Sequence, residues 1–291
     1  MKTRLSFVLL ASFLAGGLCI ASAQESMGPP KVLVITREFL KPGKGGSTHE
    51  KAESAFVQAF SRAKWPTHYL AMDSLSGKTR ALFTVGYDSF EAYEKDGKEV
   101  QKNAALASAL DHAAAVDGEL LDSMDGGTFR YREDYSFQPN VEIAHMRYFE
   151  IGVYRVRQGH TKDWDDGVKM VLAAYQKSMP NVHFACYEGI YGTPQGTYLF
   201  ITPMKSASEI DQNLSMEKQF ATAMGEDGMK KLDELSAAAI ESAETNLFIF
   251  NPRMSYVSDE MIKADPDFWK PKPPKAAAAP KKAEEKAPPK Q

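Results

Sequence analysis

An internal repeat is the feature of this sequence that most constrains its fold. The segment VLVITREFLKPG, which ends at Gly43, aligns with YFEIGVYRVRQG, which ends at Gly159, at an offset of 116 residues. Further along, ALFTVGYDSFEA from Ala81 aligns with YLFITPMKSASE from Tyr198 at an offset of 117. Self-similarity at a nearly fixed period indicates that one structural unit occurs twice. The sequence therefore predicts two similar halves in one chain.

The two halves are predicted to span residues 30–138 and 141–257, with a boundary around Pro139. Each reads strand, helix, strand, strand, helix, strand. Residues 31–39 are rich in Val, Ile and Phe, which is typical of a buried strand. Ser47 and Glu50 have the spacing of a capping box, and Thr161 is the expected N-cap of the corresponding helix.

The remaining elements follow from apolar spacing and turn residues. The face of the first helix is predicted from apolar residues at helical spacing, namely Ala52, Ala55, Phe56, Ala59 and Phe60. Two hairpins are expected across Gly-containing turns, over 67–74 with 79–86 and over 182–189 with 196–203. Longer helical regions follow, over 88–124 and 205–244, with interruptions near Gly97, Gly118, Gly225 and Gly228. The βαββαβ order is that of the ferredoxin-like motif.

At this level the sequence resembles the dimeric α/β-barrel superfamily, in which two ferredoxin-like halves join their sheets face to face. The resemblance covers about residues 30–257, with KPGKGG and RQGHTK at the strand-to-helix junctions as its local features. It implies an α+β fold in which tandem ferredoxin-like repeats form an intrachain barrel. The protein is then expected to be a monomer with an internal pseudo-dimer.

The superfamily includes antibiotic-type monooxygenases, haem-associated enzymes, EthD-like and NIPSNAP-like proteins, and modules without established chemistry. No catalytic signature of these members matches this sequence, so the resemblance assigns no catalytic residue. We expect a module that binds a small apolar ligand or a partner protein. The alternative is an enzyme of the cofactor-independent monooxygenase or haem-associated kind.

The two ends of the chain are unlike its body. Residues 1–23 have the charged start, apolar run and A-x-A site of a cleaved signal peptide, which predicts a secreted or periplasmic protein. Residues 270–291 are rich in Lys, Pro and Ala and are expected to be disordered. Their seven lysines and two glutamates give +5, whereas residues 24–269 hold 26 basic and 36 acidic residues. The tail is therefore either a solvated spacer or a contact for an anionic envelope surface.

Composition and missing motifs exclude several classes of function. Cys186 is the single cysteine after residue 23, so no intrachain disulfide forms, and it is expected to be a small core residue. An acidic, exported body disfavours nucleic-acid binding. Because no GxGxxG, phosphate loop, HExxH or paired CxxC occurs, we predict no metal site and no cofactor, apart from the haem of the enzymatic alternative.

Four side chains are candidates for binding a ligand. Glu150 falls in a strand where the first copy has Val34, and Tyr148 shares its strand face because alternate residues point the same way. His183 lies on another predicted strand of the same sheet, and His68 recurs at the equivalent place in the first half. Tyr148, Glu150 and His183 are predicted to converge on one pocket in the second half.

A different interpretation of Glu150 is purely structural. A buried carboxylate is costly unless it is paired, and Arg147 or Arg155 could pair with Glu150 across strands. His49 and His160 lie where helices begin and are interpreted as loop residues rather than ligands.

Overall fold

The computed structural model describes residues 28–179 and 181–270. The predicted signal peptide, and the predicted tail beyond Lys270, lie outside these described residues. Within them, none of the helices combines the length and the apolar character that crossing a membrane requires.

The element order in the first half is the predicted one. It comprises β1 (Val32–Leu40), α1 (Ser47–Ala63), β2 (Tyr69–Ser74), β3 (Arg80–Tyr87), α2 (Phe90–Lys102), α3 (Ala104–Gly118) and β4 (Leu121–Phe137). The second half repeats this order with β5 (Tyr148–Val156), α4 (Thr161–Ser178), β6 (Phe184–Tyr191), β7 (Thr197–Met204), α5 (Ser208–Ser215), α6 (Glu217–Ala239) and β8 (Ile240–Phe250). Both halves are therefore βαββαβ units.

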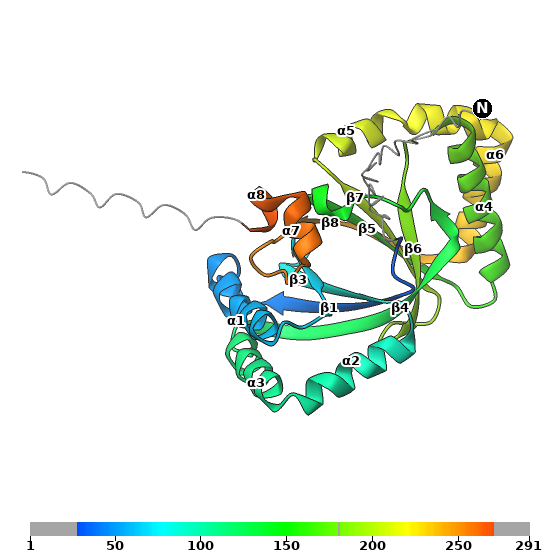
Figure 1. Ribbon diagram of the computed structural model, residues 1–291. Coiled ribbons are helices and arrows are strands. Elements are labelled where there is room, and N and C mark those ends of the chain that lie inside the picture. Colours follow the sequence, from blue (N-terminus) through cyan, green and yellow to red (C-terminus); the bar gives the residue numbers. More distant parts are fainter. Residues whose placement is uncertain (1–27, 180, 271–291) are drawn as a thin grey trace, which may run out of the picture.

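The two sheets form one closed barrel (Figure 1). Within the halves the strand orders are β4-β1-β3-β2 and β8-β5-β7-β6, and every pairing is antiparallel. Edge strand β2 pairs with β8, and β4 pairs with β6, so that each half supplies the missing neighbours of the other. The predicted α+β architecture, an intrachain dimeric α/β barrel, is confirmed.

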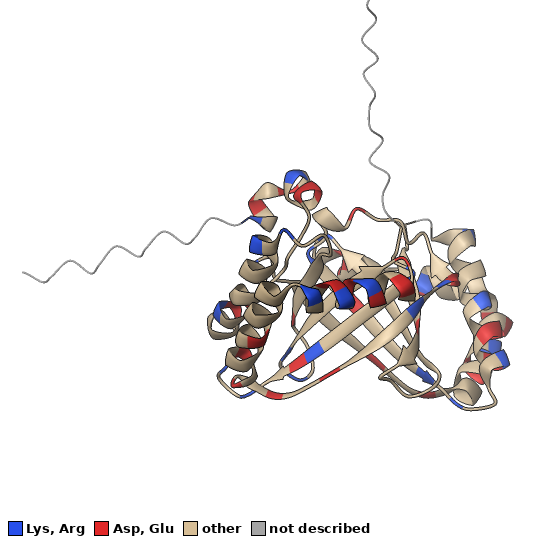
Figure 2. Ribbon diagram, turned by 60° about the horizontal axis from the view of Figure 1, so that its bottom comes forward, with Lys and Arg blue, Asp and Glu red and all other residues tan. Residues whose placement is uncertain are grey.

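Alternate strand residues fill the barrel interior and the layers outside it. Leu33, Ile35, Phe149 and Ile151 belong to one buried cluster inside the barrel. Helices α1 and α3 pack side by side in the first half, as α4 and α6 do in the second, and both pairs lie outside the barrel (Figure 1). Acidic and basic residues are interspersed along the outer helices (Figure 2). The sheet therefore has a buried layer on each side.

Elements that were not predicted close one end of the barrel. They are η1 (Ile143–His145), α7 (Asp259–Ala264) and α8 (Pro266–Trp269). Trp269 is buried in the same apolar cluster as the side chains that fill the barrel interior. Its Nε1 donates a hydrogen bond to Ala144 O at 2.7 Å. These short elements extend the apolar core beyond the strands.

The predicted helix caps are wrong. The N-cap of α1 is Gly46, with φ 63° and no side-chain cap, and Ser47 is the first helical residue. Glycine tolerates this positive φ, so the chain turns one residue earlier than a Ser47 cap would allow. Likewise the N-cap of α4 is His160 rather than Thr161.

The helical regions divide only partly where predicted. As predicted, α3 ends at Gly118 and α6 has a kink at Gly225, with φ 70°. The break between α2 and α3 falls at Asn103, whose side chain accepts a hydrogen bond from Leu106 N, and Gly97 lies inside α2. On α1, Ala55 is exposed, whereas two residues that were not counted in the apolar face, His49 and Glu53, are buried.

Candidate metal centre

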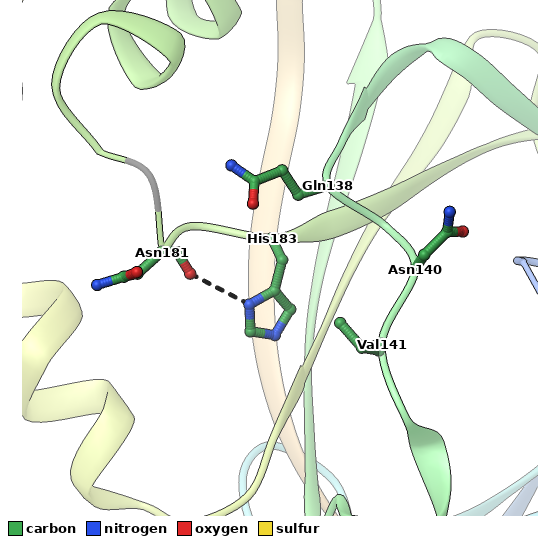
Figure 3. A pocket seen from close by; sticks show the side chains of 5 residues that line it. All are labelled: Gln138, Asn140, Val141, Asn181 and His183. Atoms are coloured by element: carbon green, nitrogen blue, oxygen red, sulfur yellow. Dashed lines mark hydrogen bonds between the residues drawn. The ribbon is translucent and has the colours of Figure 1, made fainter. Parts of the chain in front are cut away.

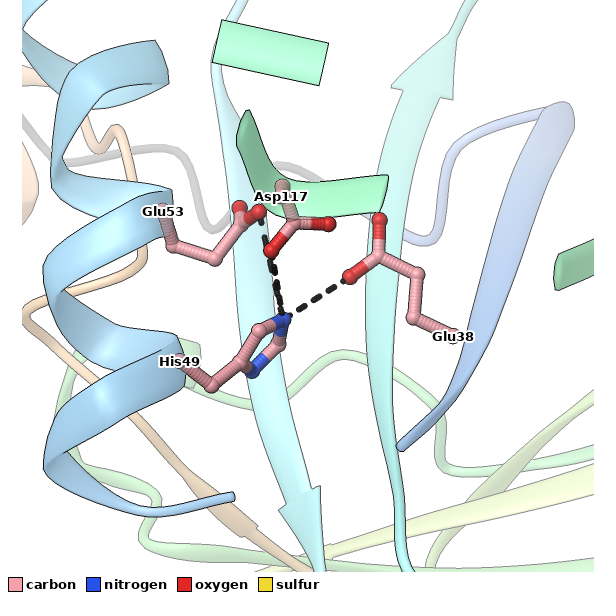
Figure 4. A group of neighbouring side chains, drawn as sticks. All are labelled: Glu38, His49, Glu53 and Asp117. Carbon is pink, nitrogen blue, oxygen red and sulfur yellow. Dashed lines mark hydrogen bonds and ion pairs between the residues drawn. The ribbon is translucent and has the colours of Figure 1, made fainter. Parts of the chain in front are cut away.

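Four buried ionisable side chains meet in the first half, between the outer face of its sheet and the helices (Figure 4). They are Glu38 of β1, His49 and Glu53 of α1, and Asp117 of α3. Their exposed fractions are only 8%, 1%, 3% and 2% in that order. One ligand atom from each lies within 4.8 Å of those of the other three. Such a cluster is unusual in a layer that normally holds apolar side chains.

Local structure explains why these residues meet. Leu33 and Ile35 face the barrel interior, so the alternation along β1 directs Glu38 to the outer face, beneath α1. His49 and Glu53 are one helical turn apart and therefore share a face of α1. Asp117 lies in the last turn of α3, which packs against α1. Three elements thus converge on one point.

That point is the Nε2 atom of His49. It lies 3.1 Å from Glu38 Oε2, 3.3 Å from Asp117 Oδ1 and 4.0 Å from Glu53 Oε1. Two of these oxygens, Glu53 Oε1 and Asp117 Oδ1, are buried without a hydrogen-bond partner among the described residues, as is Nδ1 of His49. Buried polar atoms are nearly always hydrogen-bonded, so these oxygens are available to a ligand that the protein chain does not itself provide.

The electrostatics of the cluster reflect crowded negative charge. Burial, together with the charges of Glu38 and Asp117, raises the pKa of Glu53 to about 9. Burial alone would lower the pKa of His49, but the neighbouring carboxylates of Asp117, Glu38 and Glu53 outweigh it and raise that pKa to about 10. Burial also raises the pKa of Glu38. The carboxylates therefore require positive charge within the cluster, whether from protons or from a cation.

The donor set fits a divalent transition-metal ion. It offers three carboxylate oxygens and one imidazole nitrogen, ligands that suit manganese, iron, cobalt or zinc. Ligand atoms that share one such ion at about 2.0–2.2 Å lie roughly 3–4 Å from one another. The separations around His49 Nε2 fall in this range. All four ligand atoms lie within 4.8 Å of one another, so small shifts of the carboxylates would let the four side chains surround a single ion.

Glu150, the carboxylate singled out from the sequence, lies elsewhere. It is half-buried on β5, on the face opposite to the interior residues Phe149 and Ile151, and burial raises its pKa. Neither arginine predicted to pair with it does so, because Arg147 pairs with Asp265 and Arg155 with Glu241. The ion-pair interpretation is therefore wrong: both guanidinium groups are engaged by carboxylates of later segments of the chain.

His183 lies just before β6, and its Nε2 lies 2.7 Å from Pro203 O. It lines a shallow cavity of about 370 Å³ together with Gln138, Asn140, Val141 and Asn181 (Figure 3). Tyr148, half-buried at the start of β5, and Glu150 do not line this cavity. The structure therefore does not bring the three predicted residues together there.

His68 occupies the equivalent place before β2, where its ring stacks on Tyr256 with centroids 4.9 Å apart. Burial lowers its pKa. Cys186 is fully buried and free, as predicted, and burial raises the pKa of its thiol.

The sequence analysis missed all four residues of the cluster. Two signals could have found three of them. Glu38 interrupts an apolar strand, as Glu150 does, and Glu53 falls on the same helical face as Ala52 and Ala59. A carboxylate predicted on a buried face requires a partner, and His49 one turn earlier is the nearest candidate.

No family model and no curated protein matches this sequence. Among solved structures, a proposed monooxygenase of Fusobacterium nucleatum subsp. nucleatum is similar, with 12% identity, a TM-score of 0.51, and coverage of 76% of this chain and 93% of that one. A mutant chlorite dismutase of Candidatus Nitrospira defluvii has 9% identity and a TM-score of 0.46, over 81% and 95% of the two chains. At such identities the likeness concerns architecture. The chain has the dimeric α/β-barrel fold, with both halves in one polypeptide.

Proposed function

We propose that the protein is a binding module whose first half holds one divalent transition-metal ion between Glu38, His49, Glu53 and Asp117. The observation that carries this proposal is a pair of buried oxygens, Glu53 Oε1 and Asp117 Oδ1, which accept no hydrogen bond among the described residues and lie 4.0 and 3.3 Å from His49 Nε2. With the imidazole neutral, the ionised cluster carries −3, and a divalent ion offsets most of that charge.

The number of protein ligands favours binding over catalysis. In zinc proteins, structural sites use four protein ligands, whereas catalytic sites use three and leave one position for water or substrate. Here four side chains converge, and all four are buried. This supports the binding class expected from the sequence, with a metal ion as the ligand in place of an apolar molecule.

Titration of the purified protein tests the proposal. After dialysis against EDTA, the protein is titrated with Co²⁺, Mn²⁺ and Zn²⁺ while bound metal and melting temperature are measured. We expect one ion per chain and stabilisation by about 2.7 kcal/mol at a free metal concentration of 100 Kd. Glu53→Gln should abolish the tight binding, whereas Glu150→Gln, a carboxylate change in the other half, should leave it intact. Equal binding by wild type and Glu53→Gln would refute the proposal.

The enzymatic alternative rests on the fold that the chain shares with a proposed monooxygenase. A haem-associated enzyme would require a cavity beside an axial ligand. The described cavity that includes a histidine does not fit this role, because both ring nitrogens of His183 already face backbone oxygens, at 3.3 Å from Asn181 O and 2.7 Å from Pro203 O. A stoichiometric Soret band after haem addition would nevertheless restore this alternative.

We also propose that the protein is exported and that its signal peptide is cleaved. The sequence supports cleavage between Ala23 and Gln24, which would place the module in the periplasm or outside the cell. N-terminal sequencing of the secreted chain tests this, and a retained Met1 would contradict it.

A further inference from the structure

The chain segment that follows β8 leaves the second half and packs against the first. Asn251 N donates to Ala71 O at 2.8 Å, and Tyr256 pairs with Tyr69. Met254 and Ser255 are buried in this contact, with exposed fractions of 0% and 4%. A segment of the second half thus forms part of the helix-to-sheet layer of the first half, that is, the layer of side chains between the outer face of the sheet and the helices.

Asn251 connects the first turn of α1 to strand β2. Its Nδ2 donates to Glu50 Oε1 at 3.1 Å and to Asp73 Oδ2 at 2.8 Å, and its Oδ1 accepts from Arg253 N at 3.0 Å. Arg253 adds a second contact, from Nη1 to Glu50 Oε2 at 3.1 Å. Both amide hydrogens and the amide oxygen of the buried Asn251 side chain are therefore used.

These contacts hold the start of α1, which has no side-chain cap of its own. Glu50 lies in the first helical turn, directly after His49, and Asp73 lies on the neighbouring strand β2. Asn251 therefore ties the turn that carries His49 to the sheet that carries Glu38. From this geometry we infer that Asn251 is a positioning residue for the metal ion, supplied by the second half to a site in the first. The inference rests on the proposed function.

The segment that follows β4 in the first half can be compared with the segment that follows β8. Strand β4 ends at Phe137 and is followed by Gln138 and Pro139, just as β8 ends at Phe250 and is followed by Asn251 and Pro252. Gln138, however, lines the open cavity beside His183, and among the described residues its side chain forms no hydrogen bond to α1 or α3. Gln138→Ala is therefore a control that removes the corresponding amide without touching α1.

The experiment compares Asn251→Ala, Glu50→Ala and Gln138→Ala with wild type. Co²⁺ affinity is measured by competition titration, the visible spectrum of the bound Co²⁺ reports its coordination, and melting of the metal-free protein reports folding. Loss of a group that orients a metal ligand typically costs 10–100-fold in affinity. We expect a loss of that order and an altered Co²⁺ spectrum for Asn251→Ala and Glu50→Ala, and neither change for Gln138→Ala.

The outcomes separate the two proposals. If wild type binds no metal, the proposed function fails and this inference fails with it. If wild type binds Co²⁺ and Asn251→Ala binds it with equal affinity and an unchanged spectrum, the proposed function stands and Asn251 is merely structural. Should Asn251→Ala not fold, Glu50→Ala decides by the same two readouts, since its side chain lies at the helix surface beside His49.

Discussion

The two helix-to-sheet layers of this barrel have the same geometry and opposite chemistry. The buried positions of α1 recur on α4 with the same spacing: His49, Ala52, Glu53 and Ala59 in one, and Trp164, Gly167, Val168 and Ala174 in the other. Beneath them, Glu38 pairs with Ala81 and Met124, and Tyr154 pairs with Tyr198 and Ala243 at the equivalent places in the second half. Ionisable groups in the first half therefore occupy positions that are apolar or aromatic in the second.

This difference teaches that the fold does not require charge in the layer. The second half fills it with Trp164, Val168 and Tyr198, supported by Leu172 and Phe200. Apolar replacements of buried ionic groups are often neutral or stabilising. A charged layer in the first half is therefore better explained by a ligand than by stability.

The largest expected effects come from truncating equivalent residues in the two layers. Trp164→Ala removes a buried aromatic side chain and should destabilise the protein by about 3–5 kcal/mol, with metal binding retained. His49→Ala leaves three buried carboxylates without their cationic neighbour and should cost a similar amount, about 3–5 kcal/mol, with metal binding abolished. Denaturant unfolding with and without Co²⁺ measures both. A Co²⁺ response that survives in His49→Ala would break the comparison.

A converse change makes the first layer resemble the second. The combined variant Glu38→Met, His49→Phe, Glu53→Met and Asp117→Val removes all four ligand groups at roughly conserved volume. We expect the metal-free protein to be unchanged or more stable by about 1–4 kcal/mol, and to show no metal response. Severe destabilisation of this variant in EDTA would show instead that the polar cluster is a structural requirement.

Smaller effects should appear as a pH dependence. The pKa of His49 is raised to about 10 from 6.5, and that of Glu53 to about 9 from 4.5, so both bind protons more tightly in the folded than in the unfolded chain. Stability of the metal-free protein should therefore fall as pH rises, most steeply between about 6.5 and 9, where both groups contribute. Metal stabilisation should grow over the same interval, because the ion replaces these protons. Melting curves in EDTA and in Mn²⁺ measure the two slopes, and the apolar variant should lack both.

The smallest expected effect is that of Glu150→Gln. No described residue forms an ion pair with Glu150, and burial raises its pKa, so the uncharged amide should change stability by no more than about 0.5 kcal/mol. Chemical denaturation at pH 7 tests this. A loss of several kcal/mol would point to a partner for Glu150, and an altered affinity for a small molecule would revive the pocket predicted in the second half.

The repeat was sufficient to predict two βαββαβ halves, because periodic apolar residues and their order record which faces are buried. The barrel that joins the halves was predicted from the resemblance to the dimeric α/β-barrel superfamily. Helix starts were harder, since the cap of α1 depends on the backbone of Gly46 (φ 63°) rather than on a polar side chain. The short helices α7 and α8 have too few residues to show a period and were not predicted.

The complete cluster could not be predicted, because Asp117 joins the other three residues only in three dimensions. Asp117 lies 64 residues beyond Glu53, and only the packing of α3 on α1 brings the two together. His49 in particular resembled a loop residue, because it lies between Ser47 and Glu50 in the predicted capping segment. In the structure His49 lies in the first turn of α1 and is buried.

Closure of the barrel within one chain also has a genetic consequence. A homodimer of identical halves is isologous, so any substitution in its gene appears twice, at symmetry-related places. A mutation to glutamate at the position of Glu38 would then bury two carboxylates. Each later substitution that builds the cluster would also occur twice, so every evolutionary intermediate would carry two incomplete, destabilising clusters. A fused pair is free of that symmetry. One half can accumulate charged side chains one at a time while the other, with its aromatic layer intact, keeps the barrel folded.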